Sequence, residues 1–149
     1  MTTATVTPPW AYTLHLPRDP RAPGVARSTL RAVLRVHGMA ELTDTAELLA
    51  SELVTNAYLY SEGAYSLRLR GAGRQRVRLS VQDTDPYVPA PFSRRAEAPD
   101  ALAERGRGLH LVTLWAESWG AYPAGGGLPG QGGKLLWVEC GGKAGSDTG

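Results

Sequence analysis

The chain has 149 residues, of which 42% are hydrophobic, a size and composition that fit one domain with an ordinary core. Its formal net charge of +2, with a pI near 8.9, is too weak to indicate nucleic-acid binding. Cys140, the single cysteine, excludes an internal disulfide and a zinc site built on several thiolates. No apolar run reaches the about 18 residues of a membrane span, and residues 1–9 lack signal-peptide features, so we expect a cytoplasmic protein with no membrane partner.

The first half of the chain predicts a strand, two helices and a hairpin. Large apolar residues alternate over residues 10–16 and indicate a strand. A helix is expected near Val25–Val36, where glycine follows its end. A capping-box variant starts a second helix at Asp44, which we expect to run to about Tyr60. Two glycines then separate predicted hairpin strands near 64–70 and 75–82.

The second half predicts a long loop, a helix and a closing pair of strands. Residues 84–105 contain four prolines and no clear period, which is typical of a functional lid or a disordered segment; we expect a lid. Gly106–Glu117 is expected to be helical, and residues 119–122 and 134–139 to form strands. Hairpin-linked strands with grouped helices predict an α+β two-layer sandwich.

The domain boundaries follow from composition at the two ends of the chain. We expect one domain over residues 10–140, preceded by a flexible segment at 1–9. Residues 141–149 are small and polar and predict a disordered tail.

The second predicted helix carries a carboxylate and a carboxamide on one face. Glu52 and Asn56 stand four residues apart, so their side chains point the same way. Oxygen ligands of this kind suit Mg²⁺, which needs few protein contacts when phosphates supply the rest. An ordinary solvated helix face is the alternative. Beside the pair runs an apolar stripe at helical spacing: Ala46, Leu49, Ala50, Leu53 and Ala57.

Two downstream features also indicate a nucleotide site. Asp83 ends a predicted strand, where a carboxylate favours the exocyclic amine of adenine over the carbonyl of guanine. Gly106 and Gly108 open a predicted helix, where backbone amides favour phosphates and Arg105 and Arg107 are available to pair with them. The alternatives are a turn residue at Asp83 and an ordinary tight turn at the glycines.

A second glycine-rich tract, residues 125–133, invites comparison with a phosphate-binding P-loop. Gly133-Lys134 matches the end of that motif, but Leu128 and Leu135 stand where glycine and Ser/Thr are required. We therefore interpret the tract as a hairpin loop.

In chain order these motifs resemble the GHKL ATP-binding fold shared by gyrase-type ATPases and histidine kinases. The resemblance rests on Glu52-Leu-Val-Thr-Asn56-Ala57, on a strand ending in Asp83, on Gly106-Arg-Gly108-Leu109, and on a closing strand. It covers roughly residues 10–140 and is similar in particular to the single-domain anti-sigma-factor serine/threonine kinases of the RsbW and SpoIIAB type. It implies a mixed sheet covered by helices on one face, with the nucleotide held between helices and lid.

The resemblance also implies a role for each motif residue. Asn56 would bind Mg²⁺ that bridges the phosphates of ATP, Glu52 would act as general base, and Asp83 would contact adenine. The phosphate-binding turn would comprise Arg105, Gly106, Arg107, Gly108 and Leu109. The chain departs from the family where Asp83-Thr-Asp85-Pro-Tyr87 lacks both glycines of the usual Asp-x-Gly-x-Gly motif, and where Tyr60 replaces a common histidine.

Three functions compete on the sequence alone. The first is an ATP- and Mg²⁺-dependent serine/threonine protein kinase in partner switching, with a sigma factor and a phosphorylatable antagonist protein as partners. The second is a module that binds protein partners in a nucleotide-dependent way without phosphoryl transfer. The third is an arginine-rich nucleic-acid binder, although alternation places Arg74, Arg76 and Arg78 on an ordinary wet strand face, so we expect no direct nucleic-acid partner. A homodimer is left open.

Overall fold

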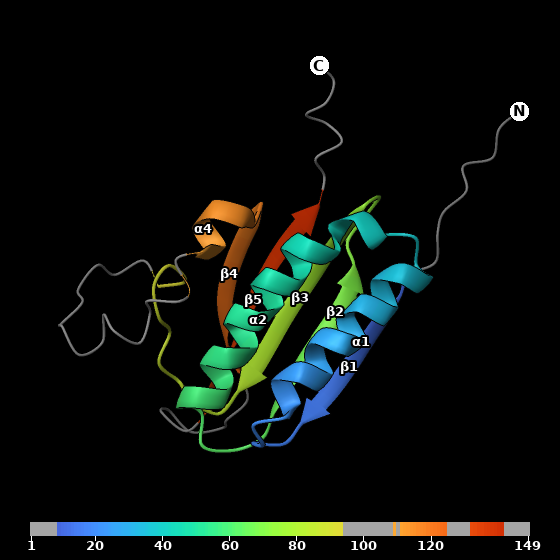
Figure 1. Cartoon of the computed structure of the whole chain (residues 1–149). Helices are drawn as coiled ribbons and strands as arrows, with labels where there is room; N and C mark the ends of the chain where they lie inside the picture. The colour runs from blue at the N-terminus through green and yellow to red at the C-terminus, as the bar shows by residue number, and fades with distance from the viewer. Residues whose placement is uncertain (1–8, 94–108, 110, 125–131, 142–149) are drawn as a thin grey trace, which may run out of the picture.

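One five-stranded sheet forms the back layer of the molecule (Figure 1). The computed structural model describes residues 9–93, 109, 111–124 and 132–141. The strands lie in the order β1-β2-β3-β5-β4. Their bounds are Ala11–Leu16 for β1, Tyr65–Gly71 for β2, Arg76–Asp83 for β3, Ser118–Ala124 for β4 and Gly133–Gly141 for β5.

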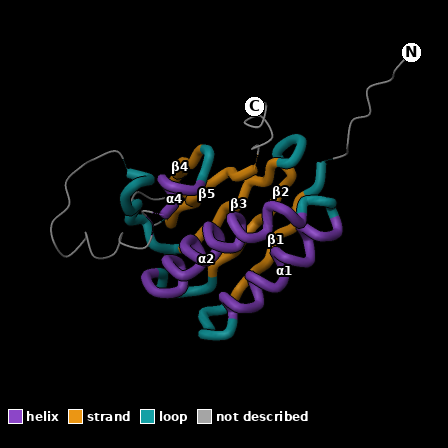
Figure 2. Tube along the Cα trace, turned by 45° about the horizontal axis from the view of Figure 1, so that its top comes forward, coloured by secondary structure: helices purple, strands orange, loops and turns teal. Residues whose placement is uncertain are grey.

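Helices cover one face of this sheet. α1 (Ala22–Val36) and α2 (Thr43–Tyr60) lie side by side across it in both ribbon views (Figures 1 and 2). A short 3-10 helix, η1 (Ala40–Leu42), joins them, and α4 (Leu111–Trp115) packs beside α2. The predicted α+β two-layer sandwich is confirmed. None of the helices in the described part of the chain is long and apolar enough to cross a bilayer.

The prediction of a mixed sheet was wrong, because all four strand pairings are antiparallel. Two helices lie between β1 and β2, so the chain crosses the molecule an even number of times and β2 runs opposite to β1. β3 and β4 do run in the same direction, but β5 lies between them and pairs with each. Because β5 lies between them, the parallel strands β3 and β4 do not pair with each other.

Two predicted helix boundaries also differ from the structure. The helix expected to reach Glu117 ends at Trp115, because the backbone N–H of Glu117 donates to Glu139 and leads the chain into β4. The capping box at the start of α2 is absent: Leu42 holds the N-cap position with no side-chain cap. Glu47 accepts instead from Arg31 of α1, with 3.1 Å between Arg31 Nε and Glu47 Oε1.

The apolar stripe of α2 packs as predicted and fixes the rotation of this helix about its axis. All five of its members are buried against sheet residues such as Leu67 and Leu79. Each fully buried leucine contributes roughly 2 kcal/mol by removal from water. With the stripe facing the sheet, Asn56 falls on the buried side of α2 and Glu52 is half-buried.

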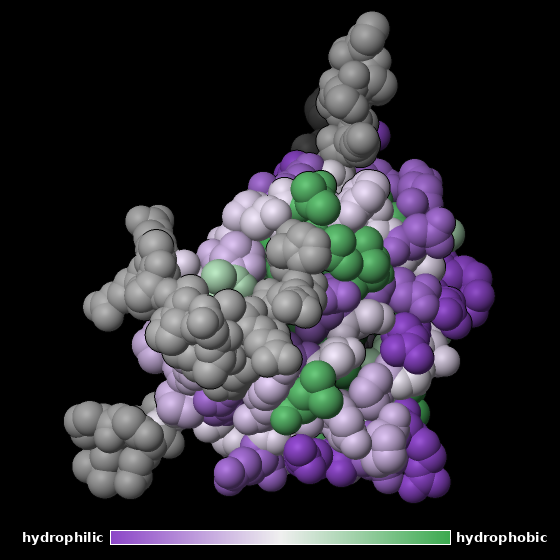
Figure 3. Space-filling view, turned by 60° about the vertical axis from the view of Figure 1, so that its left-hand side comes forward, coloured by the Kyte–Doolittle hydropathy of each residue, from purple (hydrophilic) through white to green (hydrophobic). Residues whose placement is uncertain are grey.

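The surface formed by α4 and β4 carries exposed apolar side chains. On α4, Leu114 and Trp115 are exposed, as is Tyr122 on β4. Figure 3 shows this side of the molecule, where apolar groups form small patches separated by polar surface. Single exposed apolar side chains are ordinary on a folded domain.

Cys140 is expected to resist thiol reagents in the folded protein. It lies in the core on β5, and burial raises the pKa of its thiol to about 12. The reactive thiolate is therefore scarce at about pH 8, and the sulfur is also shielded from the reagent. A disulfide reagent at this pH should label the native protein far more slowly than the urea-unfolded protein. Equal labelling rates in the two states would show that the end of β5 opens readily.

Candidate functional site

Asn56 is buried on α2 with an unsatisfied acceptor. Its side chain is 5% exposed, and its Oδ1 atom accepts no hydrogen bond from any described residue. A buried acceptor without a partner costs about 1–3 kcal/mol. The fold therefore holds at this point a hard oxygen atom that suits a cation or a polar ligand group.

Glu52 lies one helical turn before Asn56, as the spacing predicts. It is half-buried at the border of the packed face. The pair thus places a carboxylate and an unsatisfied carboxamide oxygen next to each other along one side of α2.

Asp83 ends β3 and is buried against a lysine. Its register partner on β5 is Lys134, which is 1% exposed, whereas Asp83 is 6% exposed. Lys134 Nζ lies 3.1 Å from Asp83 Oδ1 and 3.2 Å from Oδ2. It also donates to the backbone carbonyl of Asp85 at 2.9 Å.

Opposing forces act on the ionisation of Asp83. Burial raises the pKa of its carboxyl group, since the charged form loses hydration. The Lys134 ammonium and a hydrogen bond from the backbone N–H of Asp85 both act to lower this pKa, but burial outweighs them and the pKa stays above its usual value. Loss of one member of such a buried pair leaves an uncompensated charge, so we expect the two residues to depend on each other.

Hydrogen bonds hold the chain that follows Asp83 against the domain at two residues, Thr84 and Asp85. The Ser61 hydroxyl at the end of α2 lies 2.9 Å from the Thr84 hydroxyl and accepts from the Thr84 N–H at 3.3 Å. Lys134 fastens the next residue, Asp85. Farther along, Phe92 joins the hydrophobic core. Residues 84–93 of the predicted lid therefore pack against the domain, and residues 94–105 lie outside the described residues.

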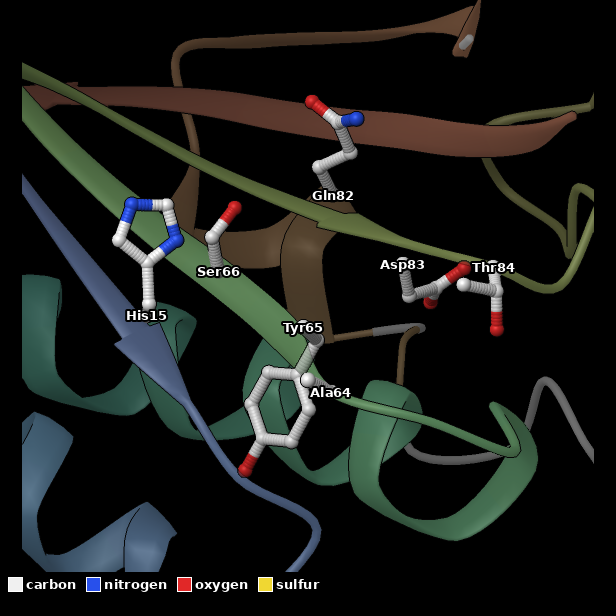
Figure 4. A pocket seen from close by; sticks show the side chains of 7 residues that line it. All are labelled: His15, Ala64, Tyr65, Ser66, Gln82, Asp83 and Thr84. Atoms are coloured by element: carbon white, nitrogen blue, oxygen red, sulfur yellow. The ribbon is translucent and has the colours of Figure 1, made fainter. Parts of the chain in front are cut away.

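A shallow cavity of about 290 Å³ opens at the sheet end beside Asp83. Figure 4 shows that His15, Ser66 and Gln82 project to one side of the sheet and Tyr65 to the other. Of the predicted site residues that the structure describes, Asp83 alone lines this cavity. The cavity therefore borders Asp83 at the end of the sheet, and neither Glu52 nor Asn56 lines it.

The predicted phosphate-binding turn is described at one position only. Arg105, Gly106, Arg107 and Gly108 lie outside the described residues. Leu109 is 2% exposed and packs in the core, as does Val112 of α4. Leu109, the last residue of the predicted turn, is therefore part of the hydrophobic core.

The sequence model of the histidine kinase-like ATPase domain family matches residues 16–126, about three quarters of the chain. The chain belongs to this family. A comparison with curated proteins finds no match. As a member of the histidine kinase-like ATPase family, the protein is an ATP-binding domain. The matched span contains α1, α2 and the whole of β3, and therefore Glu52, Asn56 and Asp83.

The sequence analysis missed Lys134, the residue that pairs with Asp83 in this ATPase-family domain. Gly133 and Lys134 are the first residues of β5, so the P-loop interpretation is excluded. Lys134 lies in the closing strand as predicted, whereas Gly133 belongs to that strand rather than to the predicted loop. A usable signal was present. Lysine occurs only at 134 and 143, and Lys134 opens an apolar strand whose alternation points it to the core.

Gly133→Ala is expected to destabilise the domain through the backbone where β3 and β5 pair. A methyl group on Gly133 would collide with the backbone carbonyl of Asp83, which cannot move without breaking the β3–β5 pairing. We expect a loss of about 1–3 kcal/mol in the free energy of unfolding, the usual cost of overpacking. Urea titration measures it. Gly63→Ala is the matched control, since nothing lies within 4 Å of the added methyl group. Equal stability of the two variants would contradict the close approach.

Proposed function

We propose that this ATP-binding domain is a serine/threonine protein kinase that acts by partner switching, as the anti-sigma-factor kinases do. The observation that carries the proposal is the buried, unpartnered Oδ1 of Asn56 one turn from the carboxylate of Glu52. Phosphoryl transfer requires a group to orient the phosphates and a base for the attacking hydroxyl, and these two side chains supply that combination.

Each site residue has a defined task in this reaction. Asn56 would hold Mg²⁺ through Oδ1, and the bound metal would neutralise charge on the phosphates. The described residues contain no group of three or more His, Cys, Asp and Glu side chains that could hold a metal. Asp83 accepts from the adenine amine, and Arg105, Gly106, Arg107, Gly108 and Leu109 form the phosphate-binding turn.

The reaction balances with Glu52 as the base. The hydroxyl oxygen of a partner's serine forms a bond to the γ-phosphorus as the bond between that phosphorus and the ADP oxygen breaks. The proton of the hydroxyl passes to the Glu52 carboxylate. The products are ADP and phosphoserine. The expected partners are a sigma factor and an antagonist protein that carries this serine, in the cytoplasm.

A second function has an observation in its favour. The segment after Asp83 lacks the usual glycines and is fastened by Ser61 and Lys134. A fastened segment suits a module that binds nucleotide and a protein partner without turnover.

Two measurements separate these functions. Calorimetry with ADP and GDP, with and without Mg²⁺, is expected to show Mg²⁺-dependent binding and a preference for adenine. Incubation with γ-labelled ATP and a soluble extract of the source cells is expected to label serine on one protein. Nucleotide binding without label transfer would favour the non-catalytic module. If neither ADP nor ATP binds, the proposed site is wrong.

A further inference from the structure

The buried Lys134 is unexplained by the family resemblance. It lies beyond residues 16–126, the span that matches the family model, yet it contacts the end of β3 directly. Its side chain is the largest by volume among the fully buried side chains of the described residues. A charge so fully removed from water is costly unless its partners satisfy it completely.

The hydrogen-bond capacities show which of the two charged groups is open to a ligand. An ammonium group has three donors, and Lys134 Nζ has three acceptors within 3.2 Å: both oxygens of Asp83 and the carbonyl of Asp85. Lys134 has no donor left for a base. Each carboxylate oxygen accepts about two hydrogen bonds. Asp83 Oδ1 accepts from Lys134 and from the Asp85 N–H, whereas Oδ2 accepts only from Lys134 among the described residues.

The charge state of Asp83 decides what the site can recognise. An ionised carboxylate offers only acceptors, whereas a protonated carboxyl group presents an O–H donor as well. The amine of adenine requires an acceptor, but the carbonyl of guanine requires a donor. A carboxyl buried without a counter-charge tends to take up a proton, and the adjacent ammonium opposes this.

We propose that Lys134 is a positioning residue for base recognition, which holds Asp83 as an oriented, ionised acceptor and so sets a preference for adenine over guanine nucleotides. This inference rests on the proposed nucleotide site. Lys134 acts through Asp83 and also fixes the following backbone at Asp85, where the chain has no glycine. Lys134 of β5 thus holds the base-binding carboxylate of Asp83 in place. The usual family motif has a flexible, glycine-containing turn after this carboxylate.

Lys134→Met tests the proposal, since methionine keeps the length of the side chain and removes its charge. We expect at least about tenfold weaker ADP binding at pH 6, the equivalent of one lost hydrogen bond to a charged group. The loss should become smaller as the pH rises, because a higher pH favours the ionised form of Asp83. The affinity of the variant is compared with that of wild type at each pH, because the titration of ADP itself affects both proteins equally. The preference for ADP over GDP should fall in parallel.

Other ionisable groups near Asp83 stay in place in this comparison. Asp85 follows it in the chain, Tyr65 of β2 and His15 of β1 line the same cavity, and Lys134 is the group removed from β5. The contributions of His15 and Tyr65 are shared by wild type and variant. Asp85 Oδ2 lies 3.7 Å from Lys134 Nζ, so Lys134→Met removes the counter-charge of both Asp83 and Asp85, and the difference between the two pH profiles reports on that loss. Asp83→Asn/Lys134→Met, which lacks both charges, should bind ADP weakly at every pH.

A second measurement needs no substitution in the pair. The chain has two lysines, Lys134 and Lys143, so ¹⁵N-labelled lysine gives two side-chain signals, and Lys143→Arg assigns them. Saturating ADP should shift the Lys134 signal, since the base contacts its partner Asp83. This readout decides the matter if Lys134→Met does not fold.

The outcomes separate the two levels of inference. A wild-type protein that binds no adenine nucleotide would overturn the nucleotide site and the role of Lys134 together. ADP binding by wild type, with a Lys134 signal that ADP leaves unchanged or with a folded Lys134→Met whose pH profile matches wild type, would overturn the role of Lys134 alone.

Discussion

Asn56→Leu is expected to abolish Mg²⁺-dependent nucleotide binding without weakening the fold. Leucine has nearly the shape of asparagine but no acceptor, so it removes the buried Oδ1 that has no partner among the described residues. Removing an unsatisfied buried polar group is neutral or stabilising, and we expect the free energy of unfolding to stay the same or rise by about 1 kcal/mol. The affinity for ADP with Mg²⁺ should fall by at least about 100-fold, because even changes to groups that only support a metal ligand cost about 10–100-fold.

Calorimetry and urea unfolding of the same preparation measure the two effects. Thr55→Ala is the matched control, since Thr55 is the neighbouring residue on α2 but is exposed. It should change neither quantity appreciably. A large loss of stability in Asn56→Leu would show that the carboxamide is a structural group, and unchanged ADP affinity would remove Asn56 from the site.

Much of the fold could be predicted because its signals are local. The stripe on α2 recurs at helical spacing, and all of its members are buried where expected. The β2–β3 hairpin is likewise encoded by alternation and a short glycine turn. Residues close in sequence determine both elements, so the sequence alone places Glu52 and Asn56 on one side of a helix.

The strand directions could not be predicted in the same way. They depend on where β5 inserts, and β5 lies between β3 and β4 rather than at an edge. No pattern within β5 itself specifies its neighbours. The family resemblance therefore predicted correctly that helices cover one face of a sheet, but it predicted wrongly that the sheet is mixed.

The same limit hid the partner of Asp83. Lys134 stands 51 positions away in the chain and becomes its neighbour only through the β3–β5 register. Glu47 shows the effect on a smaller scale: its spacing from Asp44 is typical of a helix cap, but Arg31 from α1 binds it. Long-range ion pairs override local signals wherever a charged side chain can reach a partner on another element.

Glu52→Gln is expected to separate nucleotide binding from phosphoryl transfer. Glutamine preserves the size and helix propensity of the side chain but has no basic oxygen to receive a proton. ADP affinity should remain within about twofold of wild type, whereas transfer of label from ATP should fall by roughly 10²–10⁴-fold, the usual contribution of a general base. Glu62→Gln makes the same chemical change at an exposed turn residue and should transfer at the wild-type rate.

The combination of readouts decides what Glu52 does. Transfer at the wild-type rate by Glu52→Gln would exclude the base, because no other change at this position removes the proton acceptor so conservatively. Joint loss of binding and transfer would assign Glu52 to holding the nucleotide or the helix. A third outcome is that Glu52→Gln binds ADP normally and loses transfer, while Asn56→Leu loses both binding and transfer. That combination would assign different roles to the two residues of α2. Asn56 would then hold the phosphates through the metal, and Glu52, one turn away, would activate the hydroxyl.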